Sequence, residues 1–121
     1  MNPFGHIDLR VGDLGVAQQF YETLLPALGF TERYHGELWK VWAASGAYFA
    51  VTEGRAHVAN ENRIAFSVES HEEVDRLAAV AREAGALELS GPKQMPYGPD
   101  YYAVFFADPS GNRLEVYYRR D

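Results

Sequence analysis

Apolar and polar residues alternate along three short runs of the chain, and a period of two is typical of half-buried β-strands. The run HIDLRV at 6–11 places Ile, Leu and Val on one face and His, Asp and Arg on the other. The runs RIAFSV at 63–68 and RLEVYY at 113–118 repeat this alternation. Each run therefore predicts a strand with one apolar face toward a core and one polar face away from it.

Helical spacing follows each of the first two predicted strands, because apolar residues recur at i, i+3, i+4 and i+7. These residues are Ala17, Phe20, Tyr21 and Leu24 in the first segment and Val74, Leu77, Ala78 and Ala81 in the second. Asp13 and Ser70 stand at the expected N-cap positions, and Glu73 gives Ser70 the spacing of a capping box. Gly29 and Gly85 mark the C-terminal ends. Two amphipathic helices are predicted.

The two strand–helix units are copies of one pattern, related by a shift of 57 residues from Ile7 to Ile64. They align without a gap for about two dozen positions, so that strand, cap and apolar helix face all coincide. An internal repeat of this kind predicts two similar modules related by an approximate twofold axis. Ile7 and Ile64 should then occupy equivalent places.

More strands are predicted after each helix. Residues 38–54 predict two strands joined by a turn at Ser45-Gly46, and residues 101–118 predict two strands joined by a turn at 108–111. The stretch SGPKQMPYGPD at 90–100 is rich in Pro and Gly and predicts a loop or lid. Each half is therefore expected to be β-α-β-β, with room for one further short strand.

Composition narrows the class of protein. The 121 residues fit one domain and contain no apolar run near the roughly 18–20 residues of a membrane span. The N-terminus lacks the features of a signal peptide, which predicts a cytoplasmic protein. The absence of cysteine excludes thiolate catalysis and sulfur-ligated zinc, and a net charge of −6 without a basic stripe argues against nucleic acid or anionic membrane as a partner.

Four segments resemble the vicinal oxygen chelate superfamily, which groups glyoxalase I, bleomycin-resistance proteins and extradiol dioxygenases. They are GHIDLRVGDL, FYETLLPALGF, RIAFSVES and FFADPSGNRLEVYY, and the Asp-Pro-x-Gly-Asn-x-x-Glu run in the last is the most specific. The resemblance implies an α+β fold in which two paired βαβββ modules, about 1–56 and about 57–121, form a curved mixed sheet around a pocket. It also implies that the polar strand faces point inward and that the protein is a homodimer.

Metal-using members of that family place ligands at four positions, which fall on His6, Ala50, Arg63 and Glu115 in this sequence. The resemblance thus implies His6 and Glu115 as metal ligands, whereas Ala50 has no donor atom. Arg63 has no lone pair to offer and remains positively charged, so it disfavours a divalent metal. We expect Glu115 to form an ion pair with Arg63 and His6 to remain free for a ligand. The identity of any cofactor stays open.

Several residues are candidates for binding a small molecule. Arg63 can hold a carboxylate with two hydrogen bonds, and His6 lies on the same predicted polar surface. The aromatic candidates for the pocket walls are Trp39, Trp42, Tyr97, Tyr101 and Tyr102, of which Tyr97 lies in the predicted lid.

Two functions agree with these residues. In the first, the protein binds a small aromatic or anionic molecule without metal, in the manner of the bleomycin-binding proteins. In the second, it is a metal-dependent lyase, isomerase or dioxygenase that acts on a vicinal-oxygen substrate, and Glu115 or a nearby base moves a proton. Arg63 favours the first.

Overall fold

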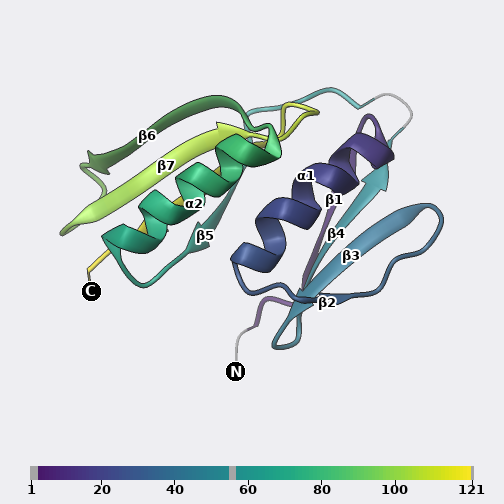
Figure 1. The fold of residues 1–121 in the computed structure, drawn as a ribbon, viewed down its shortest axis with the longest axis horizontal. Helices are drawn as coiled ribbons and strands as arrows, with labels where there is room; N and C mark the ends of the chain where they lie inside the picture. Colours follow the sequence, from purple (N-terminus) through teal and green to yellow (C-terminus); the bar gives the residue numbers. More distant parts are fainter. Residues whose placement is uncertain (1–2, 55–56, 121) are drawn as a thin grey trace.

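Each half of the chain folds as one β-α-β-β-β module in the computed structural model, which describes residues 3–54 and 57–120 (Figure 1). The first module contains β1 (His6–Val11), α1 (Leu14–Ala27), β2 (Glu32–Arg33), β3 (Trp39–Ala44) and β4 (Ala47–Glu53). The second contains β5 (Arg63–Ser67), α2 (His71–Ala84), β6 (Leu87–Met95), β7 (Tyr101–Ala107) and β8 (Arg113–Tyr118). The predicted α+β fold of two βαβββ modules is confirmed. None of the described helices has the length and apolar character needed to span a membrane.

The strands form two mixed sheets with the same topology, in the orders β1-β4-β3-β2 and β5-β8-β7-β6. In each sheet the first strand runs parallel to the last strand of its module, and the remaining pairs are antiparallel. Ile7 lies opposite Phe49 in the first sheet, and Ile64 lies opposite Leu114 in the second. The two isoleucines therefore occupy matching positions, as the repeat predicts.

The helices begin at the predicted caps. Asp13 accepts a hydrogen bond from the Val16 amide at 3.0 Å, and the Ser70 hydroxyl accepts one from the Glu73 amide at 3.1 Å. Gly85 ends α2 with a φ of 95°, a left-handed conformation that a residue without a side chain adopts freely. The sequence thus encodes both helix starts locally, through side chains that satisfy otherwise unpaired amides.

The core is continuous between the modules, because α1 and α2 pack against each other on the same side of the two sheets (Figure 1). The largest buried side chains come from both halves and include Phe20, Tyr21, Leu24, Trp42, Leu77 and Leu114. Burial of Trp42 contradicts its prediction as a pocket wall. Its indole N–H lies 3.2 Å from Glu22 and donates to it, which satisfies the only polar group of this ring.

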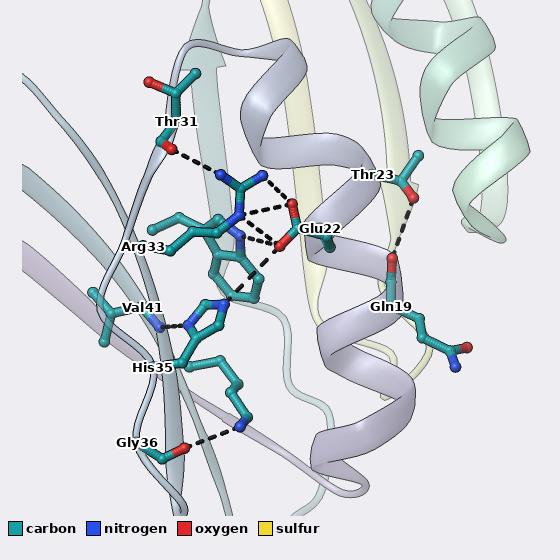
Figure 2. A network of polar contacts seen from close by, with 10 residues as sticks. Gln19, Glu22, Thr23, Thr31, Arg33, His35, Gly36 and Val41 are labelled. Carbon is teal, nitrogen blue, oxygen red and sulfur yellow. Dashed lines mark hydrogen bonds and ion pairs between the residues drawn. The ribbon is translucent and has the colours of Figure 1, made fainter.

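Glu22 organises a polar network that ties the first sheet to α1 (Figure 2). The Arg33 guanidinium donates to both of its carboxylate oxygens, the Nε contact being 2.9 Å. His35 lies beside this pair and accepts a hydrogen bond from the Val41 amide through Nδ1 at 3.1 Å. A strand of only two residues, such as β2, has little stability of its own. These contacts hold β2 against the helix.

The stretch at 90–100 is largely a strand, so its prediction as a loop or lid is wrong for residues 90–95. These residues belong to β6, which pairs with β7 through two register shifts. Proline removes a backbone donor, but β6 is the outer strand of its sheet and one row of its amides needs no partner there. Only residues 96–100 connect β6 to β7.

Candidate functional site

The predicted site residues divide between the two sheets. His6 on β1 and Trp39 on β3 lie on the polar face of the first sheet, where Trp39 is 48% exposed. Arg63, Tyr101 and Glu115 lie on β5, β7 and β8 of the second sheet. The second sheet brings more of the predicted residues together, and the candidate site lies on its polar face.

Three cations gather at one end of this face. Arg63 lies opposite Arg113 in the pairing of β5 with β8. The Arg63 guanidinium is 5.0 Å from the centre of the Phe105 ring, and the Lys93 ammonium is 5.7 Å from the same centre. We call Arg63, Lys93 and Arg113 the cationic cluster. Among the described residues, no member of this cluster forms an ion pair with a carboxylate.

Glu115, Tyr101 and Tyr117 form the other end of the face. Glu115 is only 6% exposed, and its carboxylate accepts a hydrogen bond from the Tyr101 hydroxyl at 2.5 Å. Burial, followed by this contact with Glu115, raises the pKa of Tyr101 well above its usual value, so the hydroxyl remains a donor. The Tyr101 ring stacks on Tyr117 at 4.9 Å and meets the edge of Tyr97 at 5.2 Å.

The predicted ion pair between Arg63 and Glu115 is therefore not formed. Glu115 lies opposite Ala65 on β5, two residues further along than Arg63. The Tyr101 hydroxyl reaches the carboxylate instead, and Arg63 turns to the Phe105 ring. The site is therefore cationic at the end near Arg63 and phenolic at the end near Tyr101.

A hollow of about 360 Å³ lies against the cationic end. Its lining includes the cationic cluster and one carboxylate, Glu88, together with Met95, Tyr97 and Phe105. Successive residues on one face of a strand are about 6.6 Å apart, so Arg113 and Glu115 on β8 mark two ends separated by roughly that distance. The hollow can hold a small molecule that presents a negative group to the cluster and an aromatic or apolar part to the rings.

A family model spans almost this whole arrangement. It describes the Glyoxalase/Bleomycin resistance protein/Dioxygenase superfamily and matches residues 4–116. The chain belongs to this superfamily. A search among curated proteins finds no significant match to this member.

Solved structures share the superfamily fold with this chain. A glyoxalase/bleomycin resistance protein from Albidiferax ferrireducens T118 is 22% identical, with a TM-score of 0.85 over 98% of this chain and 100% of that one. A family enzyme from Burkholderia phytofirmans PsJN is 16% identical, with a TM-score of 0.79 over 96% and 98%. The fosfomycin resistance protein FosX from Listeria monocytogenes is 21% identical, with a TM-score of 0.77 over 99% and 95%. At these identities the likeness concerns the fold alone.

The residues of this superfamily member do not fit a divalent metal. Within the described parts of the chain, no three His, Asp or Glu side chains come close enough to hold an ion. His6 and Ala50 belong to the first sheet, whereas Arg63 and Glu115 belong to the second. Arg63 adds a fixed positive charge near Glu115, and Glu115 is already bonded to Tyr101.

Tyr102 lies on the opposite face from Tyr101, because consecutive strand residues point to opposite sides. Its ring stacks on His71 at 4.2 Å, and its hydroxyl donates to Asp75 in α2 at 2.7 Å. Tyr102 therefore packs beneath α2 and lies outside the site face.

Four residues of the site were not singled out from the sequence. They are Lys93, Phe105, Arg113 and Tyr117. Alternation from Tyr101 places Phe105 on the same face, and alternation from Glu115 does so for Arg113 and Tyr117, so the signal for these three is present in the sequence. Lys93 has no such signal, because the Pro- and Gly-rich stretch around it hides the strand.

A second hollow, of about 460 Å³, lies between β1 and β5. Its apolar lining is contributed by both modules and includes Ile7, Phe30, Phe49, Ile64 and Phe66. In the described structure β1 pairs only with β4 and β5 pairs only with β8, so each keeps one open edge beside this groove. Open strand edges next to an apolar groove are suited to pairing with another chain.

Proposed function

We propose that this superfamily member binds a small aromatic anion on the polar face of its second sheet. The observation that carries the proposal is the cationic cluster, which has no carboxylate partner in the described structure although the chain has a net charge of −6. With acidic residues in excess, three neighbouring cations that remain unpaired favour an external anion as their partner.

The surroundings of the cluster support an aromatic ligand. Arg63 and Lys93 both line the hollow and lie over the Phe105 ring, and the Lys93 ammonium also donates to the Ser90 hydroxyl at 2.8 Å. A carboxylate can accept two parallel hydrogen bonds from the Arg63 guanidinium. The Tyr97 ring lines the hollow and the Tyr101 ring meets it edge-on, so these rings can pack against an aromatic ligand.

Glu115 supports one orientation of the ligand. Its buried carboxylate repels a second negative charge, so the anionic group of the ligand belongs at the cationic end. Tyr101 already donates its hydroxyl hydrogen to Glu115 and can only accept a further hydrogen bond. A ligand with a hydroxyl or amino group at its far end would satisfy that acceptor.

Calorimetric titration with benzoate, phenylphosphonate and inorganic phosphate tests this proposal. We expect Arg63→Gln and Lys93→Gln each to weaken binding of the aromatic anions by on the order of tenfold, since each removes a charge-assisted hydrogen bond. Arg82→Gln, on the exposed side of α2, is the matched control with the same charge change. Equal losses in all three variants, or no binding of any probe to the unmodified protein, would overturn the proposal.

We also propose that the protein is a homodimer. Support comes from the open edges of β1 and β5, from the apolar groove between them, and from exposed aromatic side chains such as Trp39 and Tyr48 on the first sheet. The other function considered, a metal-dependent lyase, isomerase or dioxygenase, stays a prediction. Metal analysis of protein purified without chelators or a His-tag tests it.

A further inference from the structure

Residues 96–100 lie beside the candidate site as a short connection between β6 and β7. Tyr97 is 60% exposed, lines the hollow at the cationic end and meets Tyr101 edge-on at 5.2 Å. Gly98 has a φ of 153° and Asp100 a φ of 50°. Asp100 is therefore in the left-handed region, which costs free energy for a residue with a side chain and persists only where other contacts hold it.

The contact that holds Asp100 comes from the opposite side of the sheet. Asp100 Oδ1 lies 2.8 Å from Nε2 of His71, the first residue of α2. An ionised carboxylate only accepts hydrogen bonds, so Nε2 of His71 carries the proton and donates it. His71 thus supplies an anchor for the end of the connection that joins β7.

His71 is itself fixed by its neighbours. Its ring stacks on Tyr102 with the planes 13° apart and meets the edge of Tyr118 at 5.5 Å. Tyr102 in turn donates to Asp75, one turn further along α2. Asp100, Tyr101 and Tyr102 are consecutive in the chain. The anchored Asp100 is therefore followed directly by Tyr101 on the site face and by Tyr102 on the face beneath α2.

We propose that His71 is a positioning residue that holds residues 96–100 closed, so that Tyr97 covers the bound molecule. His71 lies on the far side of the sheet from the ligand and acts through Asp100, whose neighbour Pro99 also accepts a hydrogen bond from the Arg120 amide at 3.3 Å. When the bond between His71 and Asp100 is lost, Asp100 can leave the left-handed conformation and the connection can move Tyr97 away from the hollow. The ligand part of this inference rests on the proposed function, whereas the anchoring part does not.

Amide hydrogen exchange tests the anchor without any ligand. His71→Phe keeps the ring that stacks on Tyr102 but removes the Nε2 donor. We expect exchange of the Arg120 amide, which donates to the Pro99 carbonyl at 3.3 Å, to accelerate by on the order of tenfold. Asp100→Asn is the matched control, because asparagine keeps an acceptor oxygen and tolerates the left-handed region. Amides of the turn at Ser45-Gly46 should be unchanged. Unchanged exchange of the Arg120 amide in His71→Phe would overturn the proposal.

The dissociation rate of benzoate tests whether Tyr97 covers the bound molecule. Line-shape analysis of benzoate NMR signals should give dissociation from His71→Phe on the order of tenfold faster than from the unmodified protein, and Asp100→Asn should resemble the latter. If benzoate dissociates at the same rate from His71→Phe and from the unmodified protein while exchange of the Arg120 amide differs, Tyr97 does not cover the ligand and that part of the proposal fails. If benzoate does not bind the unmodified protein, the proposed function fails, and the exchange result alone decides whether His71 anchors the connection.

Discussion

The Tyr21 hydroxyl donates a hydrogen bond to the Asp108 carboxylate over 2.6 Å, and both side chains are fully buried. This bond joins α1 of the first module to the turn between β7 and β8 of the second. Asp108 also accepts from the amides of Ser110 and Asn112, each at 2.9 Å, and from the Asn112 side chain at 3.0 Å. The Asp-Pro-x-Gly-Asn run is thus a structural element that fastens the two modules together.

Removing Asp108 should destabilise the protein far more than removing its partner. Asp108→Ala leaves several buried donors unsatisfied, and we expect the free energy of unfolding to fall by about 3–5 kcal/mol. Tyr21→Phe removes one donor of four and should cost about 1–2 kcal/mol. Urea denaturation of the two variants measures both values. Equal losses, or a loss below about 1 kcal/mol in Asp108→Ala, would show that this turn does not join the modules.

Stability should decrease below neutral pH because of His35. Its Nδ1 accepts from the Val41 amide, which only the neutral ring permits. Burial, followed by repulsion from Lys40, lowers the pKa of His35, while Glu22 opposes this and Arg33 reinforces it. Because the folded-state pKa lies below the unfolded value of about 6.5, this contribution is present above that pH and is lost as pH falls through the folded-state pKa.

The variant that tests this is His35→Asn, whose side-chain oxygen can replace Nδ1 as acceptor without titrating. Thermal unfolding at several values between about pH 7 and pH 5 should show a smaller decrease in stability than for the unmodified protein. His6→Asn on exposed β1 removes a histidine elsewhere and should leave the decrease unchanged. The same slope in His35→Asn and in the unmodified protein would exclude His35 as the cause.

Local patterns predicted most of the fold because they are set by neighbours in the chain. Asp13 and Ser70 cap helices through amides two or three residues away, and alternation fixes which strand residues share a face. Tertiary context decided the rest. Trp39 and Trp42 are both apolar and lie on opposite faces of β3, and only the packing of α1 determines that Trp42 is the buried one.

Local patterns also predicted only part of the candidate site. Alternation places Arg63 and Glu115 on polar strand faces. It cannot show that the Glu115 carboxylate bonds to Tyr101, at the far end of the β7–β8 hairpin, and not to Arg63. The sequence did not indicate Lys93 because its strand contains glycine and proline, which are typical of loops. An outer strand tolerates proline. Pairings between distant segments are the part that local patterns leave undetermined.

Dimerisation should depend on the groove between β1 and β5. Phe4 lines that groove and is exposed, so Phe4→Asp should keep the fold but weaken self-association by on the order of tenfold or more. Leu38→Asp is the control at an exposed apolar position outside the groove lining. Light scattering across a concentration series measures both. A monomer at high micromolar concentration of the unmodified protein would contradict the homodimer.

Metal affinity should be low in the unmodified protein because Arg63 carries a fixed positive charge on the strand next to that of Glu115. At about 4 Å and an effective dielectric constant near 20, two unit charges of like sign repel by roughly 4 kcal/mol, and a divalent ion meets about twice that. Calorimetric titration with Zn²⁺ or Ni²⁺ should therefore detect weak binding or none. Stoichiometric, tight binding would show that Arg63 turns away and that another residue completes a site.

Substitution of Arg63 by histidine should raise the metal affinity. Arg63→His removes the charge and adds an imidazole on the strand next to Glu115, and we expect Zn²⁺ or Ni²⁺ affinity to rise by orders of magnitude if His6 supplies a third donor. His6 lies in the other sheet, so the three donors meet only if the first sheet of the same or of a second copy brings His6 to this face. The double variant Arg63→His with His6→Ala separates the two cases. A gain that survives His6→Ala would exclude His6 as a ligand, whereas a gain that is lost with it requires the two sheets to come together.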